Sequence, residues 1–165
     1  MNKKISVVGN TVAAALTLVS STGLVAAQTV LTEKQISLSA ANDAAQATLA
    51  TCRQAGFRIS VAVLDRGGNL KVILREDGAG LHTVDSARRK AYTALTFRVP
   101  SAEFAQRTSA TPALTNLEEV LALAGGLPIR SGEEVIGAIG VGGAPSGDRD
   151  AACAQAGLDR IKSRL

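Results

Sequence analysis

The sequence predicts an α+β fold in which helices flank an antiparallel sheet within a single domain. Two segments, residues 57–75 and 125–141, each place β-type residues on both sides of a turn and so have the pattern of hairpins. Helical apolar spacing occurs before, between and after these hairpins. A chain of 165 residues, 46% of them hydrophobic, fits one such domain and leaves little room for a second.

The first 27 residues have the pattern of a secretory signal peptide. Lys3 and Lys4 form a positive start, an apolar stretch covers residues 12–19, and Val25-Ala26-Ala27 offers small residues for cleavage before Gln28. A membrane anchor is the alternative, but polar residues interrupt this stretch, and a span needs about 20 apolar residues. No Cys near the cut could accept a lipid. We therefore expect a mature domain over residues 28–165, periplasmic or secreted, with no stable membrane anchor.

Charge and aromatic content argue against a nucleic-acid partner. The formal net charge is +4, and without Lys3 and Lys4 it falls to +2. The chain has only four aromatic residues, which is too few for a base-stacking platform.

The two cysteines, Cys52 and Cys153, lie 101 positions apart. In an oxidising compartment they can form a disulfide, which is the first expectation. Two buried thiols are the alternative, because unpaired Cys also buries readily.

A first helix is expected from a cap at Thr32 to a left-handed end at Gly56. Its stripe is mostly alanine, so a partner element can approach closely; the stripe consists of Ile36, Ala40, Ala44 and Ala47. The first hairpin follows, with a strand over 57–63, a turn over 65–69 and a strand over 70–75.

The middle of the chain predicts mainly helix. One helix begins at His82 or Thr83, and its apolar side carries Val84, Ala87, Ala91 and Leu95. A short helix starts near Pro100 and runs through Phe104, the region ends at Thr111-Pro112, and residues 117–123 are expected to form another helical turn or two.

The second hairpin has strands over 125–130 and 135–141 around a turn at 131–134. Gly137 and Gly140 in its last strand predict close contact with another backbone or with a ligand. The last helix is capped by Ser146 or Asp148, and its buried stripe is expected to be Ala151, Ala154, Leu158, Ile161 and Leu165.

Five segments together resemble the GlcG/HbpS-like family, also called the haem-degrading domain family. They are residues 58–70, 75–79, 90–94, 125–128 and 137–143, and the resemblance covers the chain from Leu31 onward. It implies a profilin-like domain that commonly forms homo-oligomers and is associated with haem binding or small-molecule catabolism. Gly143 stands where members carry Ser or Gly, so a loop hydroxyl found in some of them is missing here.

The loop over residues 142–147 is a candidate ligand site because it leads into a helix start, where backbone N–H groups favour an anion. Gly142, Gly143 and Ser146 are its candidate ligand-binding residues, and an ordinary capped turn is the alternative. The loop lacks the Lys and Ser/Thr pair of a Walker A motif.

Arg75 and Lys90 match basic positions of the family, and in a shared pocket they would hold an acidic ligand. A solvated positive face is the alternative, and it is the preferred interpretation for Arg88 and Arg89.

His82, the only histidine, is the candidate haem-iron ligand or proton carrier, and a functionless loop position is the alternative. The mature chain has no methionine, so other protein ligands for haem iron would be Tyr92 or unpaired cysteines.

The sequence thus favours an exported protein that binds haem or a small acid. One alternative is an enzyme of small-molecule catabolism or haem degradation that uses Lys90, Arg75 or His82. Another is an oligomeric assembly protein whose glycines serve subunit packing. Classical hydrolase chemistry is disfavoured because no motif supports a Ser/His/Asp set.

Overall fold

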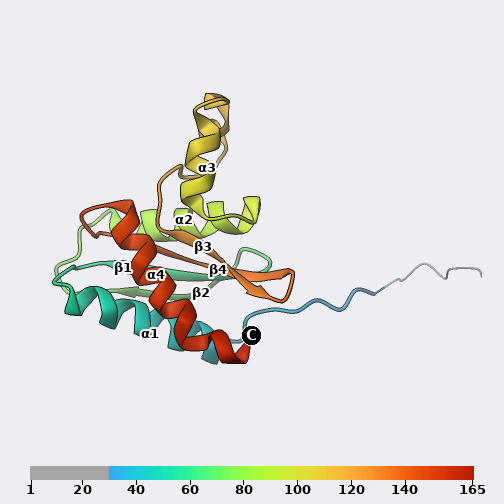
Figure 1. Cartoon of the computed structure of the whole chain (residues 1–165), viewed down its shortest axis with the longest axis horizontal. Helices are drawn as coiled ribbons and strands as arrows, with labels where there is room; N and C mark the ends of the chain where they lie inside the picture. The colour runs from blue at the N-terminus through green and yellow to red at the C-terminus, as the bar shows by residue number, and fades with distance from the viewer. Residues whose placement is uncertain (1–29) are drawn as a thin grey trace, which may run out of the picture. The chain divides into compact units, whose positions relative to one another are not determined.

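A four-stranded antiparallel sheet of order β2-β1-β4-β3 organises the chain (Figure 1). The first hairpin consists of β1 (Ser60–Asp65) and β2 (Leu70–Arg75), and the second consists of β3 (Gly126–Ser131) and β4 (Glu134–Gly142). The hairpins join through β1 and β4, with Ser60 opposite Gly142. This computed structural model describes residues 30–165, so the predicted signal peptide lies outside the described residues.

Helices cover both faces of the sheet, which confirms the predicted α+β class (Figure 1). Helices α1 (Leu38–Gln54) and α4 (Gly147–Ile161) lie on one face, and α2 (Thr83–Phe97) lies on the other. Helix α3 (Ser101–Thr108) packs against α2, and short 3₁₀ helices cover Pro112–Asn116 and Lys162–Arg164. Among residues 30–165, no helix combines the length and apolar character that a membrane span requires.

Every residue of β1 is buried, so both faces of this strand contribute to the core. Val61 and Val63 face the larger core under α1 and α4, together with Ile59 just before the strand. Leu64 packs under α2 with Ala91 and Ala94. The expected alternation is therefore present, but its second face is covered by α2 and does not face solvent.

Glycines in the second hairpin allow the backbone of α2 to pack directly against the backbone of the hairpin. A Cβ on Gly140 would lie 2.1 Å from the carbonyl oxygen of Ala87, and one on Gly126 would lie 2.0 Å from that of Lys90. A Cβ on Gly137 would lie 2.5 Å from the carbonyl oxygen of Leu64 on β1. The close contact predicted for Gly137 and Gly140 is thus made with the chain's own backbone.

Helices α1 and α4 also approach closely, as the alanine-rich stripe predicts. A Cβ on Gly157 would lie 2.6 Å from the carbonyl oxygen of Ala44. A disulfide joins Cys52, near the end of α1, to Cys153, near the start of α4. The helices therefore run antiparallel, and the disulfide expectation is confirmed over the buried-thiol alternative.

The expected start of the first helix is wrong. Helix α1 begins after Ser37, whose hydroxyl accepts a bond from the N–H of Ala40, and the expected cap at Thr32 lies outside it. Ile36 precedes the helix, where it is buried and donates its backbone N–H to Ile136 at 3.1 Å. This hydrogen bond joins Ile36 to β4, so Ile36 lies outside the helix.

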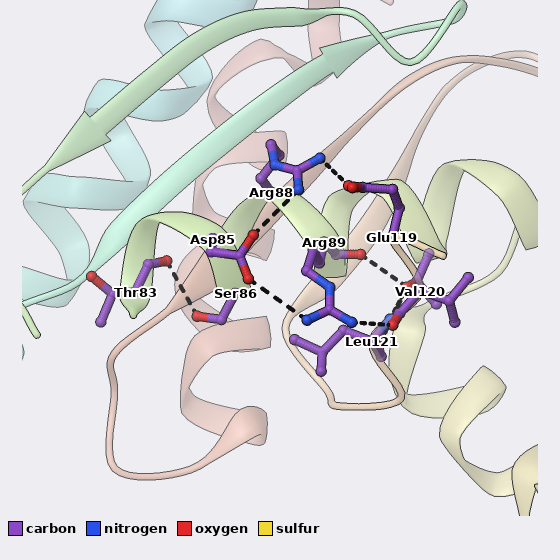
Figure 2. Close-up of polar contacts among 9 residues, drawn as sticks. Thr83, Asp85, Ser86, Arg88, Arg89, Glu119, Val120 and Leu121 are labelled. Carbon is purple, nitrogen blue, oxygen red and sulfur yellow. Dashed lines mark hydrogen bonds and ion pairs between the residues drawn. The ribbon is translucent and has the colours of Figure 1, made fainter. Parts of the chain in front are cut away.

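Residues 117–123 form no helix, because side chains of α2 bind their backbone. The N–H of Leu121 donates to the Thr93 hydroxyl at 2.9 Å. The Arg89 guanidinium donates to the carbonyl of Val120 at 2.8 Å (Figure 2). These bonds replace the helical hydrogen bonds that the segment would otherwise form.

The disulfide predicts a large loss of stability on its removal. Cys52→Ala/Cys153→Ala should lower the free energy of unfolding by about 2–5 kcal/mol, since the bond closes a long loop in the unfolded chain. Urea unfolding of both proteins, with and without reductant, measures this. Reductant should destabilise only the wild type, and equal unfolding midpoints without reductant would contradict the prediction.

Candidate functional site

A pocket of about 450 Å³ lies between the start of α2 and the loop that leads into α4. It is the place where the sequence predicts a ligand site. Its lining comes from three segments and comprises Gly80, His82, Thr83, Ser86, Lys90, Leu123, Ala124, residues 143–148 and Asp150. Four of the predicted site residues therefore line one cavity: His82, Lys90, Gly143 and Ser146.

The start of α2 is fixed by Thr83, which leaves the side chain of His82 available. The Thr83 hydroxyl donates to the carbonyl of Gly80 at 2.7 Å and lies 2.8 Å from the Ser60 hydroxyl of β1. His82 occupies the N-cap position but makes no side-chain cap bond. Its exposed imidazole lies over Gly80, where a Cβ would come within 3.0 Å of the ring. The absence of a side chain at Gly80 therefore makes room for the imidazole.

The loop opposite is shaped by Gly143 and Ser146. Gly143 has a φ of +123°, and a Cβ there would lie 2.7 Å from the carbonyl oxygen of Arg58. Ser146 caps α4, as predicted, by accepting a bond from the N–H of Arg149 at 3.4 Å. Gly142 does not line the pocket, and the space beside it holds the Ser86 hydroxyl, 2.3 Å from where a Cβ would be.

A buried ion pair lies at the inner part of the pocket. Lys90 Nζ is 2.6 Å from Asp150 Oδ2, and the two residues are only 5% and 3% exposed. Asp150 Oδ1 accepts the backbone N–H of Ala144 at 2.9 Å. Burial raises the pKa of Asp150, although the hydrogen bonds from Lys90 and Ala144 act in the opposite direction.

Sequence reasoning missed Asp150, yet a signal for it was present. Lys90 falls on the apolar stripe of α2, between Ala87 and Ala91, and a Lys on a buried face needs a buried partner. The sequence does not say which carboxylate supplies that partner, because Asp150 is 60 positions away.

The structure does not bring Arg75 and Lys90 together in one pocket. Arg75 does not line the cavity, and its guanidinium donates to the carbonyl of Ala79. The interpretation of Arg88 and Arg89 as a solvated positive face is also incomplete, because both side chains have partners in the protein. Arg88 forms ion pairs with Asp85 and Glu119, and Arg89 donates to the carbonyl of Val120 in the segment that follows the 3₁₀ helix Pro112–Asn116 (Figure 2). Both arginines therefore hold the 117–123 segment against α2.

Within residues 30–165, no group of three or more His, Cys, Asp or Glu side chains is arranged to hold a metal ion.

The raised pKa of Asp150 predicts a pH dependence of stability. The folded protein holds this proton more tightly than the unfolded chain, so its contribution to the free energy of unfolding falls as pH rises from about 4 through the raised pKa. Urea unfolding at several pH values should show this slope in the wild type and in Asp159→Asn, which removes an exposed carboxylate of the same helix. Lys90→Met/Asp150→Asn should lack it, and an unchanged slope in that variant would refute the assignment.

Known proteins share this sequence pattern and this fold. The model of the family described as haem degrading protein HbpS-like matches residues 36–159. A Citrobacter freundii protein, described as an uncharacterized 15.0 kDa protein in the dhaT-dhaS intergenic region, is 33% identical over 129 residues, which covers 75% of this chain and 90% of that protein.

Solved structures agree with the family match. The crystal structure of a double mutant of Streptomyces reticuli HbpS is 42% identical with a TM-score of 0.77, covering 79% of this chain and 89% of that one. A complex of PduOC with haem is 21% identical with a TM-score of 0.71, covering 77% and 95% of the two chains, and this likeness shows a shared fold. Because the family model spans most of the described residues, the chain belongs to the HbpS-like family, as its motifs predict.

Proposed function

We propose that this protein binds haem in the pocket between α2 and the loop over residues 143–148. The observation that carries the proposal is the position of His82, the only histidine of the chain, at a pocket of about 450 Å³ in a protein of a family described as haem degrading. Neutral imidazole is a common ligand of haem iron.

The surroundings of His82 fit a porphyrin, which is a large apolar ring with two acidic groups at one edge. Leu81 beside it is 88% exposed, and Leu123 on the pocket wall is 54% exposed. Exposed leucines beside a pocket mark a place where an apolar ligand gains by burial. Haem iron held here would supply redox chemistry, while the chain's residues would bind and orient the ring.

The alternatives have less support from the geometry. A small acid held by Arg75 and Lys90 is disfavoured, since Lys90 is already paired and Arg75 lies outside the pocket. The glycines invoked for an assembly protein, Gly137 and Gly140, serve packing within the chain. Homo-oligomer formation stays a proposal that rests on the family resemblance, and haem degradation by this chain stays a proposal that rests on the family description.

We also propose that the protein is exported. The disulfide between Cys52 and Cys153 fits an oxidising compartment, since disulfides are rare in reducing ones. The predicted signal peptide over residues 1–27 accords with the same destination.

Export predicts a mature chain that begins near Gln28. The intact mass of protein recovered from the periplasm or the medium of an expressing bacterium measures this. The mass should correspond to residues 28–165, and a mass that retains Lys3 and Lys4 would exclude cleavage.

Haem binding predicts a saturable change in the Soret band when haemin is added to the purified protein. His82→Ala should lower the affinity about tenfold or more and shift the band, because the iron loses its nitrogen ligand. Asn42→Ala, on an exposed position of α1 across the sheet, should behave as wild type.

The outcomes separate the two parts of this proposal. If wild type shows no saturable change, haem binding is wrong. If His82→Ala matches wild type in both affinity and band position, the pocket is retained and the iron ligand is not His82.

A further inference from the structure

The position that an acidic ligand would occupy beside Lys90 is taken by the chain's own carboxylate. A ligand carboxylate would use a cation and a backbone amide as donors, and the pocket wall offers Lys90 and the N–H of Ala144. Asp150 uses both: Oδ2 lies 2.6 Å from Lys90 Nζ, and Oδ1 lies 2.9 Å from the nitrogen of Ala144.

The charges around the pocket oppose displacement of Asp150 by a second acid. Its lining carries two carboxylates, Asp148 and Asp150, against the single ammonium of Lys90, and His82 is the remaining titratable group. A ligand carboxylate placed beside Lys90 would share one ammonium with Asp150 in a place where both partners are at least 95% buried. Like charges at such a site are costly because little water screens them.

We propose that Asp150 determines the specificity of this pocket. Asp150 neutralises Lys90 and accepts the N–H of Ala144, so the inner end of the pocket favours an uncharged part of the ligand. Acidic groups of the ligand would then lie at the mouth of the pocket. The identity of the ligand rests on the proposed function. For haem, an apolar edge of the ring would enter first, and the propionates would face solvent.

The first test uses acetate as a probe of the free protein and needs no haem. Amide NMR would follow the N–H of Ala144 during acetate titration of wild type, Asp150→Asn and Lys90→Met/Asp150→Asn. We expect no saturable shift in wild type, a saturable shift in Asp150→Asn, whose Lys90 has lost its partner, and none in the double variant.

Saturable acetate binding at Ala144 in wild type would overturn the proposal, as would a folded Asp150→Asn that binds none. Asp150→Asn leaves a buried ammonium without a partner and can unfold for that reason. The double variant removes both charges, a change that folded proteins often tolerate, and its Asn can still accept from Ala144. If Asp150→Asn unfolds, saturable acetate binding at Ala144 in the wild type still overturns the proposal.

The second test compares haemin with haemin dimethyl ester, in which both propionates are uncharged. Wild type should bind the two within about threefold of each other, and a preference for haemin of about tenfold or more would show that an acidic group is held by charge and overturn the proposal. If neither porphyrin binds, the proposed function fails, while the acetate result still decides the role of Asp150.

Discussion

The contact between α2 and the second hairpin is the constraint on which the rest of this structure depends. At Gly126 and Gly140 the backbone of the hairpin contacts the backbone of α2, and a methyl group at either position would overlap a carbonyl oxygen of α2. Overpacking of this kind typically costs about 1–3 kcal/mol and forces the backbone to shift. Because α2 lies so deep, Lys90 on its inner side is buried, and the start of the helix reaches the edge of the pocket.

Burial of Lys90 in turn requires Asp150. A buried ion pair is not a strong source of stability, since both ions lose their water, but either ion alone would be very costly. The carboxylate that satisfies Lys90 also binds the amide of Ala144 and so fixes the loop before α4. The depth of one helix thus determines the charge and the shape of the pocket wall across from it.

Local features of this fold were predictable from the sequence, and long-range partners were not. The hairpins, the cap at Ser146 and the close contacts of Gly140 follow from residue type and spacing. The start of α1 and the path of residues 117–123 depend on hydrogen bonds to Ile136 and to side chains of α2, which no local pattern contains. For the same reason Lys90 was identified as a site residue, but its partner was not.

The Asp150 carboxylate affects both the stability of the fold and, under the proposal above, the ligand preference of the pocket. Helix α4 is held to α1 by the disulfide at Cys153 and to α2 by Asp150, one turn earlier, so the pocket wall is tied to both faces of the sheet. A change at Asp150 that would admit an acidic group also leaves Lys90 unpaired in the core. A change at Lys90 alone leaves the buried carboxylate unpaired. Changing both residues together avoids an unpaired buried charge, so the charge of the pocket is linked to the packing of α2.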